Sequence, residues 1–506
     1  MRTSSLFFVF LPCFALGCSS GSPSNGDVAE GGAGDDGGAV TPGSPDATSP
    51  VGDGSASTGG KDGATGPVGD GSTGGHKDGG APTPPPPTGV DAGPITGLTG
   101  TTYYVAPGGS DSNPGTSASP WKTIQQAGAV VKAGDTVLVR AGTYDGAVFG
   151  WDSAPCTKDV YCAVVGTSTN PILFEADPAA AAGSVIIASK NAKTKIGFDL
   201  EPGCNYVHVV GFTVTNAGTP GTAAGSITKA GIAVAKSTGN RVLNNTVDGV
   251  TGIGGIFVDS VTDVLIEGNT TINIQGTGTT GHGMYVSGSS AGVQVVENRM
   301  HDNAYIGLHV NGDVSEGLPG VVKNILVEGN LIYKNGQNGI NADGIQSSTF
   351  VNNVIYGNSR HGIELYQIDA FGGSTGNVIV NNTIDQSASS GGYAISVSSC
   401  QYDNQSSQPT PAGCSTSSAD TSTGNVAFNN VLLGGAGATG TVSSADLSTS
   451  SNLTSITGLF VGAATGNYTL LPAGPGAGAG VGSFGGASAP VAPGGGYDIG
   501  AFSFVQ

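Results

Sequence analysis

A short pattern recurs from residue 207 onward and constrains the fold of the chain more than any other feature. Each copy is an alternating apolar run that ends in Asn, followed by a turn and then by Gly-apolar-x-apolar. At their closest, the recurring Asn residues lie 23 and 24 residues apart; they are Asn245, Asn269, Asn298, Asn330, Asn353, Asn382 and Asn430. A period this short, made of alternating strands, suits neither a propeller blade nor a leucine-rich repeat. We therefore expect an all-β solenoid, a single-stranded parallel β-helix of about ten coils.

In such a solenoid, equivalent residues of successive coils stack about 4.8 Å apart. Apolar residues at alternate positions would fill a narrow core, and the recurring Asn would stack its side-chain amide on the next coil. Asn also tolerates the left-handed backbone of a tight turn. The alternative is a β-sandwich with regularly spaced strands, but sandwich strands need not repeat one motif in register.

Composition narrows the classes of function. The chain of 506 residues has 89 Gly and 27 Pro but only 10% charged residues, which excludes coiled coils, basic nucleic-acid-binding proteins and helix-rich enzymes. With a formal net charge of −19 we expect no nucleic-acid partner. The chain has no apolar run long enough for an ordinary transmembrane helix.

The first 97 residues predict export and tethering. Residues 1–18 carry one positive charge and an apolar stretch, as a secretory signal does, and end in Ala15-Leu16-Gly17-Cys18. This ending resembles a bacterial lipobox, which implies lipidation of Cys18. Residues 19–97 are rich in Gly, Ser, Pro and Asp and nearly lack large apolar side chains, so we expect a disordered tether. We expect a monomer, lipid-anchored to the bacterial outer membrane or cell surface, that touches the membrane only through its lipid.

Residues 98–506 form the expected β-helix domain. Pro120 to Val131 predicts a short amphipathic helix with Ile124, Ala127 and Val131 on one face, and residues 136–140 predict the first strand. Together with the run Tyr103-Tyr-Val-Ala-Pro-Gly-Gly-Ser-Asp, these segments resemble the N-terminal cap of bacterial right-handed β-helix proteins, notably family-nine pectate lyases and the chondroitinase B/alginate lyase group. The segment 496–502 resembles the closing segment of many such chains. The resemblance implies a right-handed parallel β-helix with a short N-terminal capping helix.

Five cysteines remain after the signal and the lipobox. Because export permits disulfides, we expect two bridges that each close a short loop, Cys156 with Cys162 and Cys400 with Cys414. Cys204 is left over and is expected to be a buried thiol. The sequence has no CxxC motif or His-Cys cluster, so a zinc site is not expected.

Strand alternation predicts which side chains point outward from the Gly-apolar-x-apolar strands. Three consecutive coils stack polar residues there: His309 and Asn311, Asn341 and Asp343, then Glu364 and Tyr366. His282, Tyr285 and His361 flank this patch, whereas we read His301 and His208 as structural. Two insertions, residues 313–322 and 369–375, leave the same strand as the Cys400–Cys414 loop, and all three are expected to make the patch a groove. Its polar residues also suit a merely solvated face.

The first reaction that fits the groove is β-elimination from a uronic-acid polymer, which needs a neutralised carboxylate, a base and an acid. Asn341 would bond the substrate carboxylate, His309 or His361 would be the base and Tyr366 the proton donor, while Arg360 and Lys334 would supply positive charge. Calcium held by Asp343, Glu364, Asp313 and Asp369 is an alternative source of charge. The chain lacks an adjacent Asp pair on this strand and so departs from family-nine pectate lyases.

Two other functions fit as well. Asp343 and Glu364 occupy diagonal positions on adjacent coils, which suits the acid and base of an inverting glycoside hydrolase. A non-catalytic adhesin or glycan-binding protein would instead use Tyr285, Phe257 and Tyr366. The expected ligand in each case is a polysaccharide.

Overall fold

The computed structural model describes residues 97–150, 163–216, 225–316, 319–398, 422–441, 445–455, 457–463, 467–471, 473–492 and 495–501. The expected signal, Cys18, the tether up to residue 96 and both expected disulfides (Cys156, Cys162, Cys400 and Cys414) lie outside these residues. Cys204 is a fully buried free thiol, as predicted, and burial raises its pKa to about 12.

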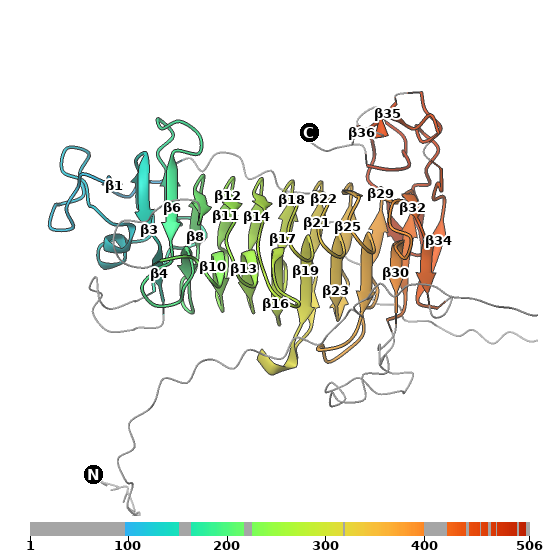
Figure 1. Cartoon of the computed structure of the whole chain (residues 1–506), viewed down its shortest axis with the longest axis horizontal. Coiled ribbons are helices and arrows are strands. Elements are labelled where there is room, and N and C mark those ends of the chain that lie inside the picture. The colour runs from blue at the N-terminus through green and yellow to red at the C-terminus, as the bar shows by residue number, and fades with distance from the viewer. Residues whose placement is uncertain are drawn as a thin grey trace, which may run out of the picture. The chain divides into compact units, whose positions relative to one another are not determined.

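The described chain winds through three long parallel sheets, one strand of each per coil (Figure 1). Sheet 1 has twelve strands: β1 Thr102–Val105, β2 Thr136–Val139, β5 Ile172–Ala176, β8 Val207–Val210, β11 Arg241–Leu243, β14 Leu265–Glu267, β17 Gln294–Val296, β21 Leu326–Glu328, β25 Thr349–Val351, β28 Val378–Val380, β31 Asn425–Phe428 and β34 Leu447–Ser450. Sheet 2 has ten: β3 Gly142–Asp145, β6 Val185–Ser189, β9 Thr213–Thr215, β12 Thr246–Asp248, β15 Thr270–Ile272, β18 Arg299–His301, β22 Leu331–Tyr333, β26 Val354–Tyr356, β29 Thr383–Gln386 and β32 Val431–Gly434. Sheet 3, which carries the predicted patch, also has ten: β4 Ala147–Phe149, β7 Phe198–Leu200, β10 Ala230–Ala235, β13 Gly254–Asp259, β16 His282–Gly288, β19 Leu308–Gly312, β23 Ile340–Asp343, β27 Ile363–Tyr366, β30 Tyr393–Val397 and β33 Gly437–Thr441. The expected parallel β-helix is confirmed.

Alternate residues of each strand fill one continuous core. Leu308 and Val310 of β19 point inward and pair in register with Ile340 and Ala342 of β23, and all four are fully buried. Burying one such aliphatic side chain stabilises a fold by about 1.5–3 kcal/mol. Because this pairing repeats from coil to coil, a shift of one residue would turn the whole apolar set outward.

The predicted asparagine stack runs along the turn from sheet 1 to sheet 2. Asn245, Asn269, Asn298 and the later repeat asparagines are all buried, and each Nδ2 donates to Oδ1 of the Asn one coil on, at 2.9–3.1 Å. The left-handed conformation falls not on these residues but on the residue before each, for example Asn244 at φ 56° and Asn381 at φ 55°. The stacked Asn is therefore chosen for its amide and not for its backbone.

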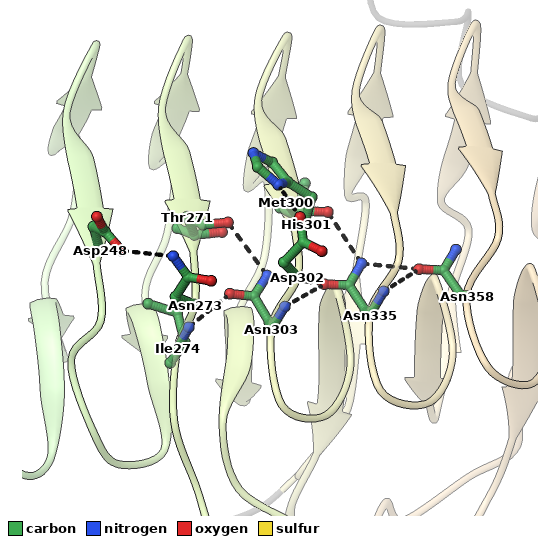
Figure 2. Close-up of polar contacts among 10 residues, drawn as sticks. All are labelled: Asp248, Thr271, Asn273, Ile274, Met300, His301, Asp302, Asn303, Asn335 and Asn358. Atoms are coloured by element: carbon green, nitrogen blue, oxygen red, sulfur yellow. Dashed lines mark hydrogen bonds and ion pairs between the residues drawn. The ribbon is translucent and has the colours of Figure 1, made fainter. Parts of the chain in front are cut away.

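A second asparagine stack, which the sequence did not predict, runs along the turn from sheet 2 to sheet 3 (Figure 2). Asn303 donates to Oδ1 of Asn335 at 2.9 Å, and Asn335 donates to Oδ1 of Asn358 at 2.9 Å. These residues precede β19, β23 and β27, so they fix the start of the three strands that carry the predicted patch.

The repeated Gly before each inward residue of sheet 3 is required by the close approach of successive coils. A Cβ on Gly307 would lie 2.6 Å from the carbonyl oxygen of Gly339, and one on Gly339 would lie 2.7 Å from that of Gly362. Since these are backbone atoms of a paired strand, they cannot move aside without breaking the ladder.

The N-terminal cap closes the open edge of the solenoid with a short 3₁₀ helix of six residues, η1 Ile124–Ala129. Ile124 and Ala127 are buried as predicted, while Val131 is only partly buried. Gln125 pairs with the edge strand β4, donating from Nε2 to the Val148 carbonyl at 2.8 Å and accepting from the Val148 amide at 2.9 Å. The segment 136–140 predicted as the first strand is the second, since β1 precedes it.

The C-terminal segment closes the other end. Asp498 and Gly500 bond the turns of the last coils, the first accepting from Asn381 Nδ2 at 2.7 Å and the second donating to the Asn429 carbonyl at 2.7 Å. Short elements complete the described chain: η2 Val314–Glu316, the parallel pair β20 Val322–Lys323 and β24 Ile345–Gln346, and the antiparallel pairs β35 Phe460–Gly462 with β36 Asn467–Leu470 and β37 Ser483–Phe484 with β38 Ala487–Ser488. No helix among the described residues is long and apolar enough to span a membrane.

Replacing Asn330 by Ala tests the first stack. The change leaves the Val295 carbonyl and the Asn353 amide oxygen without the donor that Asn330 Nδ2 supplies, and each such buried loss costs about 1–3 kcal/mol. We expect the midpoint of denaturant unfolding to fall accordingly. The exposed Thr262→Ala variant should unfold like the wild type, and equal stability of the two variants would contradict the role of the stack.

Candidate functional site

The strand register of sheet 3 brings the predicted residues together. His309 pairs with Asn341 and Asn341 with Glu364, while Asn311 pairs with Asp343 and Asp343 with Tyr366. We call these six residues the polar patch: His309, Asn311, Asn341, Asp343, Glu364 and Tyr366. Only His309 is partly exposed, and the other five are buried. A polar face that is merely solvated would not be buried, so these groups form an internal network.

Glu364 is the centre of that network. Its Oε2 accepts from Asn338 Nδ2 at 2.6 Å, and its Oε1 lies 3.8 Å from Arg360 Nη2 and 3.7 Å from His361 Nε2. Arg360 is the more exposed partner, with 34% of its side chain accessible against 4% for Glu364. A buried carboxylate is thus held between an amide, a guanidinium and an imidazole.

The network continues to Tyr366 through two amides. Asn338 Nδ2 also donates to Asn341 Oδ1 at 3.1 Å, and Asn341 Nδ2 donates to the Tyr366 hydroxyl oxygen at 2.9 Å. The prediction omitted Asn338, which is fully buried. A sequence signal existed, because Asn338 occupies the position just before the repeated Gly, as His282 and His361 do.

Asp343 has a different task from the one predicted. Its two oxygens accept hydrogen bonds from the backbone N–H groups of Ile368 and Asp369, at 2.9 and 2.6 Å. The Asp369 carbonyl in turn accepts from the Val314 amide at 3.2 Å. Asp343 therefore anchors both inserted segments, which protrude side by side at the lower edge of Figure 1 after β19 and β27.

The residues proposed for calcium do not fit such a site. Both oxygens of Asp343 already accept amide hydrogen bonds, and Asp313 Oδ1 accepts from the Ser315 amide at 2.7 Å. Within the described ranges, no group of three or more His, Cys, Asp or Glu side chains is arranged to hold a metal ion. The proposed mechanism therefore includes no step that depends on calcium bound by Asp313, Asp343, Glu364 or Asp369.

The histidines of the site are neutral bases held by burial. Burial lowers the pKa of His309 to about 3, and burial followed by the Arg360 charge lowers the pKa of His361 to about 4. Burial, and then His309, lowers the pKa of His282 well below its usual value. His361 Nδ1 accepts from the Tyr393 amide at 3.0 Å, so its lone pair is occupied and its other nitrogen carries the proton.

His309 is the histidine suited to act as a base. Its Nδ1 lies 3.3 Å from His282 Nε2, and its ring stacks on Tyr285 with the centroids 4.5 Å apart. Its Nε2 is buried, and no described residue bonds it. Tyr285 is itself held by Asn311, whose Nδ2 donates to the Tyr285 hydroxyl at 3.1 Å.

Other predicted residues lie elsewhere. Lys334 lies in the turn that leads from β22 to β23, with its Nζ 6.0 Å from the centre of the Tyr333 ring on sheet 2. His301 is structural as expected, stacked 4.5 Å from Tyr333 and paired with Asp302 at 2.7 Å (Figure 2). His208 lies on the outer face of sheet 1 rather than in the core.

Two acidic residues near an earlier strand of sheet 3, Asp199 and Glu201, were not predicted from the sequence. Asp199 pairs in register with Ala233 and so shares the column of the patch, and Glu201 follows two residues later. Burial, and then the Glu201 carboxylate, raises the pKa of Asp199 well above its usual value, and the Thr194 hydroxyl donates to it. The alternation Asp199-Leu200-Glu201 was a readable signal, but it lies before the recurring pattern.

Comparison with known proteins supports the architecture. Residues 103–266 match the family model described as "Pel9A-like, right handed beta helix region", and residues 279–452 match "Right handed beta helix region". No curated protein matches the chain. The solved structure of pectate lyase Pel9A is similar at 17% identity and a TM-score of 0.50, over 80% of this chain and 97% of that one.

Two further solved structures are more distant. A rhamnogalacturonan lyase is 18% identical with a TM-score of 0.45, over 64% of this chain and 87% of that one. The periplasmic alginate epimerase AlgG is 12% identical with a TM-score of 0.39, over 66% and 83%. At such identities likeness concerns the fold, which is a right-handed parallel β-helix.

Replacing Asp343 by Asn tests its anchoring role. The amide keeps one acceptor oxygen where two backbone N–H groups need one each, so we expect the segment after β27 to loosen by about 1–3 kcal/mol. Hydrogen exchange at the amides of Ile368 and Asp369 should rise at least tenfold. Asp313→Asn serves as the matched control, and unchanged exchange in the Asp343 variant would show that the carboxylate anchors nothing.

The pH dependence of stability tests the burial of His309. Because burial disfavours its charged form, the unfolded chain binds more protons between the ordinary pKa of about 6.5 and the folded value of about 3. Stability is thus complete above about pH 6.5 and falls as the pH drops below it, by at most about 1.4 kcal/mol per pH unit for this group. His309→Gln should flatten the slope, while Ser287→Ala should not. An unaltered slope in the His309 variant would refute the assignment.

Proposed function

We propose that this right-handed parallel β-helix protein cleaves an acidic, uronic-acid-containing polysaccharide by β-elimination at the polar patch. The observation that carries the proposal is the register of β19, β23 and β27, which places His309 and Tyr366 on one face of sheet 3, two coils apart. The partly exposed guanidinium of Arg360 lies beside Glu364 in the same coil as Tyr366. His309, Arg360 and Tyr366 are the base, the countercharge and the acid that the elimination requires. The fold is one that a pectate lyase also uses.

Each step uses a side chain of the site described above. Arg360, the exposed partner of Glu364, would pair with the substrate carboxylate and acidify the neighbouring C–H. His309 Nε2 would take that proton, the electron pair would form the carbon–carbon double bond, and the bond to the leaving oxygen would break. Tyr366, oriented by the Asn341 amide, would protonate the leaving oxygen.

The low pKa of His309 is compatible with this role once substrate is bound. An imidazole of pKa about 3 is a weak base in the free protein. A uronate carboxylate beside it would favour the imidazolium form and so raise that pKa towards its ordinary value. Asn338, Glu364 and His361 would act as positioning residues, since they hold Arg360 and Asn341 in place.

The alternatives are less well supported. An inverting hydrolase would use Asp343 and Glu364, which do lie diagonally, but Asp343 is bonded through both oxygens to the backbone of the inserted segment. A non-catalytic glycan-binding protein remains an outcome of the test below. We further propose that the protein is exported and lipid-anchored through Cys18 to the bacterial outer membrane or cell surface.

The test is to incubate the purified protein with pectate, alginate and glycosaminoglycans, with and without calcium. We expect ultraviolet absorbance from unsaturated products, and a loss of at least about 100-fold in kcat/KM for His309→Gln. Arg360→Gln should raise KM, because the group that pairs with the substrate carboxylate is gone. Lys334→Gln removes the same charge from sheet 2 and should change neither constant.

The other outcomes are equally specific. New reducing ends without unsaturated products would mean hydrolysis, and binding without either product would mean a glycan-binding protein. Either result would overturn the proposed elimination. An absolute need for calcium would indicate that the carboxylates of the patch, Asp343 and Glu364, bind the metal during the reaction.

A further inference from the structure

A hollow lies on the outer face of sheet 1, on a different side of the coil from the polar patch. It has a volume of about 220 Å³ and lies at the starts of β5, β8 and β11. It is lined by Ser168, Pro171, Tyr206, His208, Gly239, Arg241 and Asp263. Sites for drug-sized ligands measure roughly 300–1,000 Å³, so this one suits a single small polar unit.

Three polar side chains of the hollow, those of Arg241, Asp263 and His208, have polar atoms that no described residue bonds. Arg241 pairs in register with His208, and no described residue forms an ion pair or hydrogen bond with its guanidinium. The same holds, within the described chain, for the Asp263 carboxylate at the rim. Nδ1 of His208 is buried and unbonded as well. Burial, and then the Arg241 charge, lowers the pKa of His208 to about 3, so this imidazole is neutral.

Tyr206 forms an aromatic wall that the backbone holds in place. The backbone of Tyr206 adopts φ 52°, which is uncommon for a residue with a bulky side chain. The ring packs on Gly239, where an added Cβ would lie 2.3 Å from a ring carbon. A glycine at this position is therefore needed to leave the ring where it lines the hollow.

We propose that this hollow binds a carboxylate-bearing sugar unit, with Arg241 forming paired hydrogen bonds to the carboxylate. A guanidinium matches a carboxylate in geometry and charge, while Asp263 and His208 accept or donate to hydroxyl groups and Tyr206 covers the apolar side of the ring. An unpaired arginine is a notable feature in a chain with 17 Lys and Arg and a net charge of −19. The choice of an acidic sugar rests on the proposed function, but the site is separate from the patch and would hold a part of the polymer remote from cleavage.

Calorimetric titration with galacturonic acid tests the inference. All measurements use the full chain carrying Arg360→Gln, so that the countercharge of the patch is absent. We expect galacturonic acid to bind, galactose to bind at least tenfold more weakly, and the further change Arg241→Gln to weaken galacturonic acid binding at least tenfold. Arg299→Gln, which removes an outward arginine from sheet 2, should alter binding less than twofold.

Three results would overturn the site: no binding of galacturonic acid, equal binding of galactose, or unchanged binding in the Arg241 variant. Because Arg241 lies outward and is only half-buried, the thermal midpoint of that variant should match its parent, which separates lost binding from lost folding. Product formation from short oligomers should be unaffected by Arg241→Gln alone. A chain that binds through Arg241 yet cleaves nothing would refute the proposed elimination and leave this site standing.

Discussion

Hydrogen bonds between side-chain amides of successive coils are the interaction on which the rest of this structure depends. The backbone hydrogen bonds between neighbouring parallel strands are alike in every register. Only the side chains of a parallel β-helix distinguish one register from another. Two asparagine stacks, one at each of two turns, place a buried amide at a fixed point of each of several successive coils. A coil that slipped by one residue would leave these amides unbonded and its apolar residues exposed, which links the register to stability.

The same register decides what the outer face can do. Residues 309, 341 and 364 are separated by more than twenty residues in the chain yet are direct neighbours across β19, β23 and β27. Burial then gives their side chains properties that solvent would not. It keeps the imidazoles neutral and holds Glu364 in a hydrogen bond with Asn338, beside the Arg360 guanidinium and the His361 imidazole. Arg360, with 34% of its side chain accessible, is the member that a ligand can meet directly.

The sequence was sufficient for the fold and for the columns of the site, because both follow from period and alternation. The stacked Asn residues, the inward residues of sheet 3 and the neighbours of Glu364 across the strands were all predicted correctly. Contacts that depend on where a side chain turns could not be read in this way. Asp343 lies diagonal to Glu364 as predicted, but both of its oxygens accept hydrogen bonds from backbone N–H groups of an inserted segment, which the sequence did not predict. Lys334 was placed near the patch because its turn leads there, yet its side chain stays with Tyr333 on sheet 2.

Two further features were not predicted. Asn303, Asn335 and Asn358 each stand four positions before the repeated Gly of their coil, a spacing that the sequence analysis did not use. The hollow around Arg241 joins residues from four coils, and no local motif marks it.

Disulfide trapping between Tyr333 and Tyr356 tests the register most directly. These partly exposed residues pair across β22 and β26, the strands that precede β23 and β27 in the same two coils. Neighbouring parallel strands lie about 4.8 Å apart, within the reach of a disulfide, whereas His301 and Tyr356 are two coils, or about 9.6 Å, apart. The account predicts a cross-link in the Tyr333→Cys/Tyr356→Cys protein and none in the His301→Cys/Tyr356→Cys protein, read by peptide mass spectrometry. A cross-link in the second protein and none in the first would contradict the register, and with it the shared column of residues 309, 341 and 364.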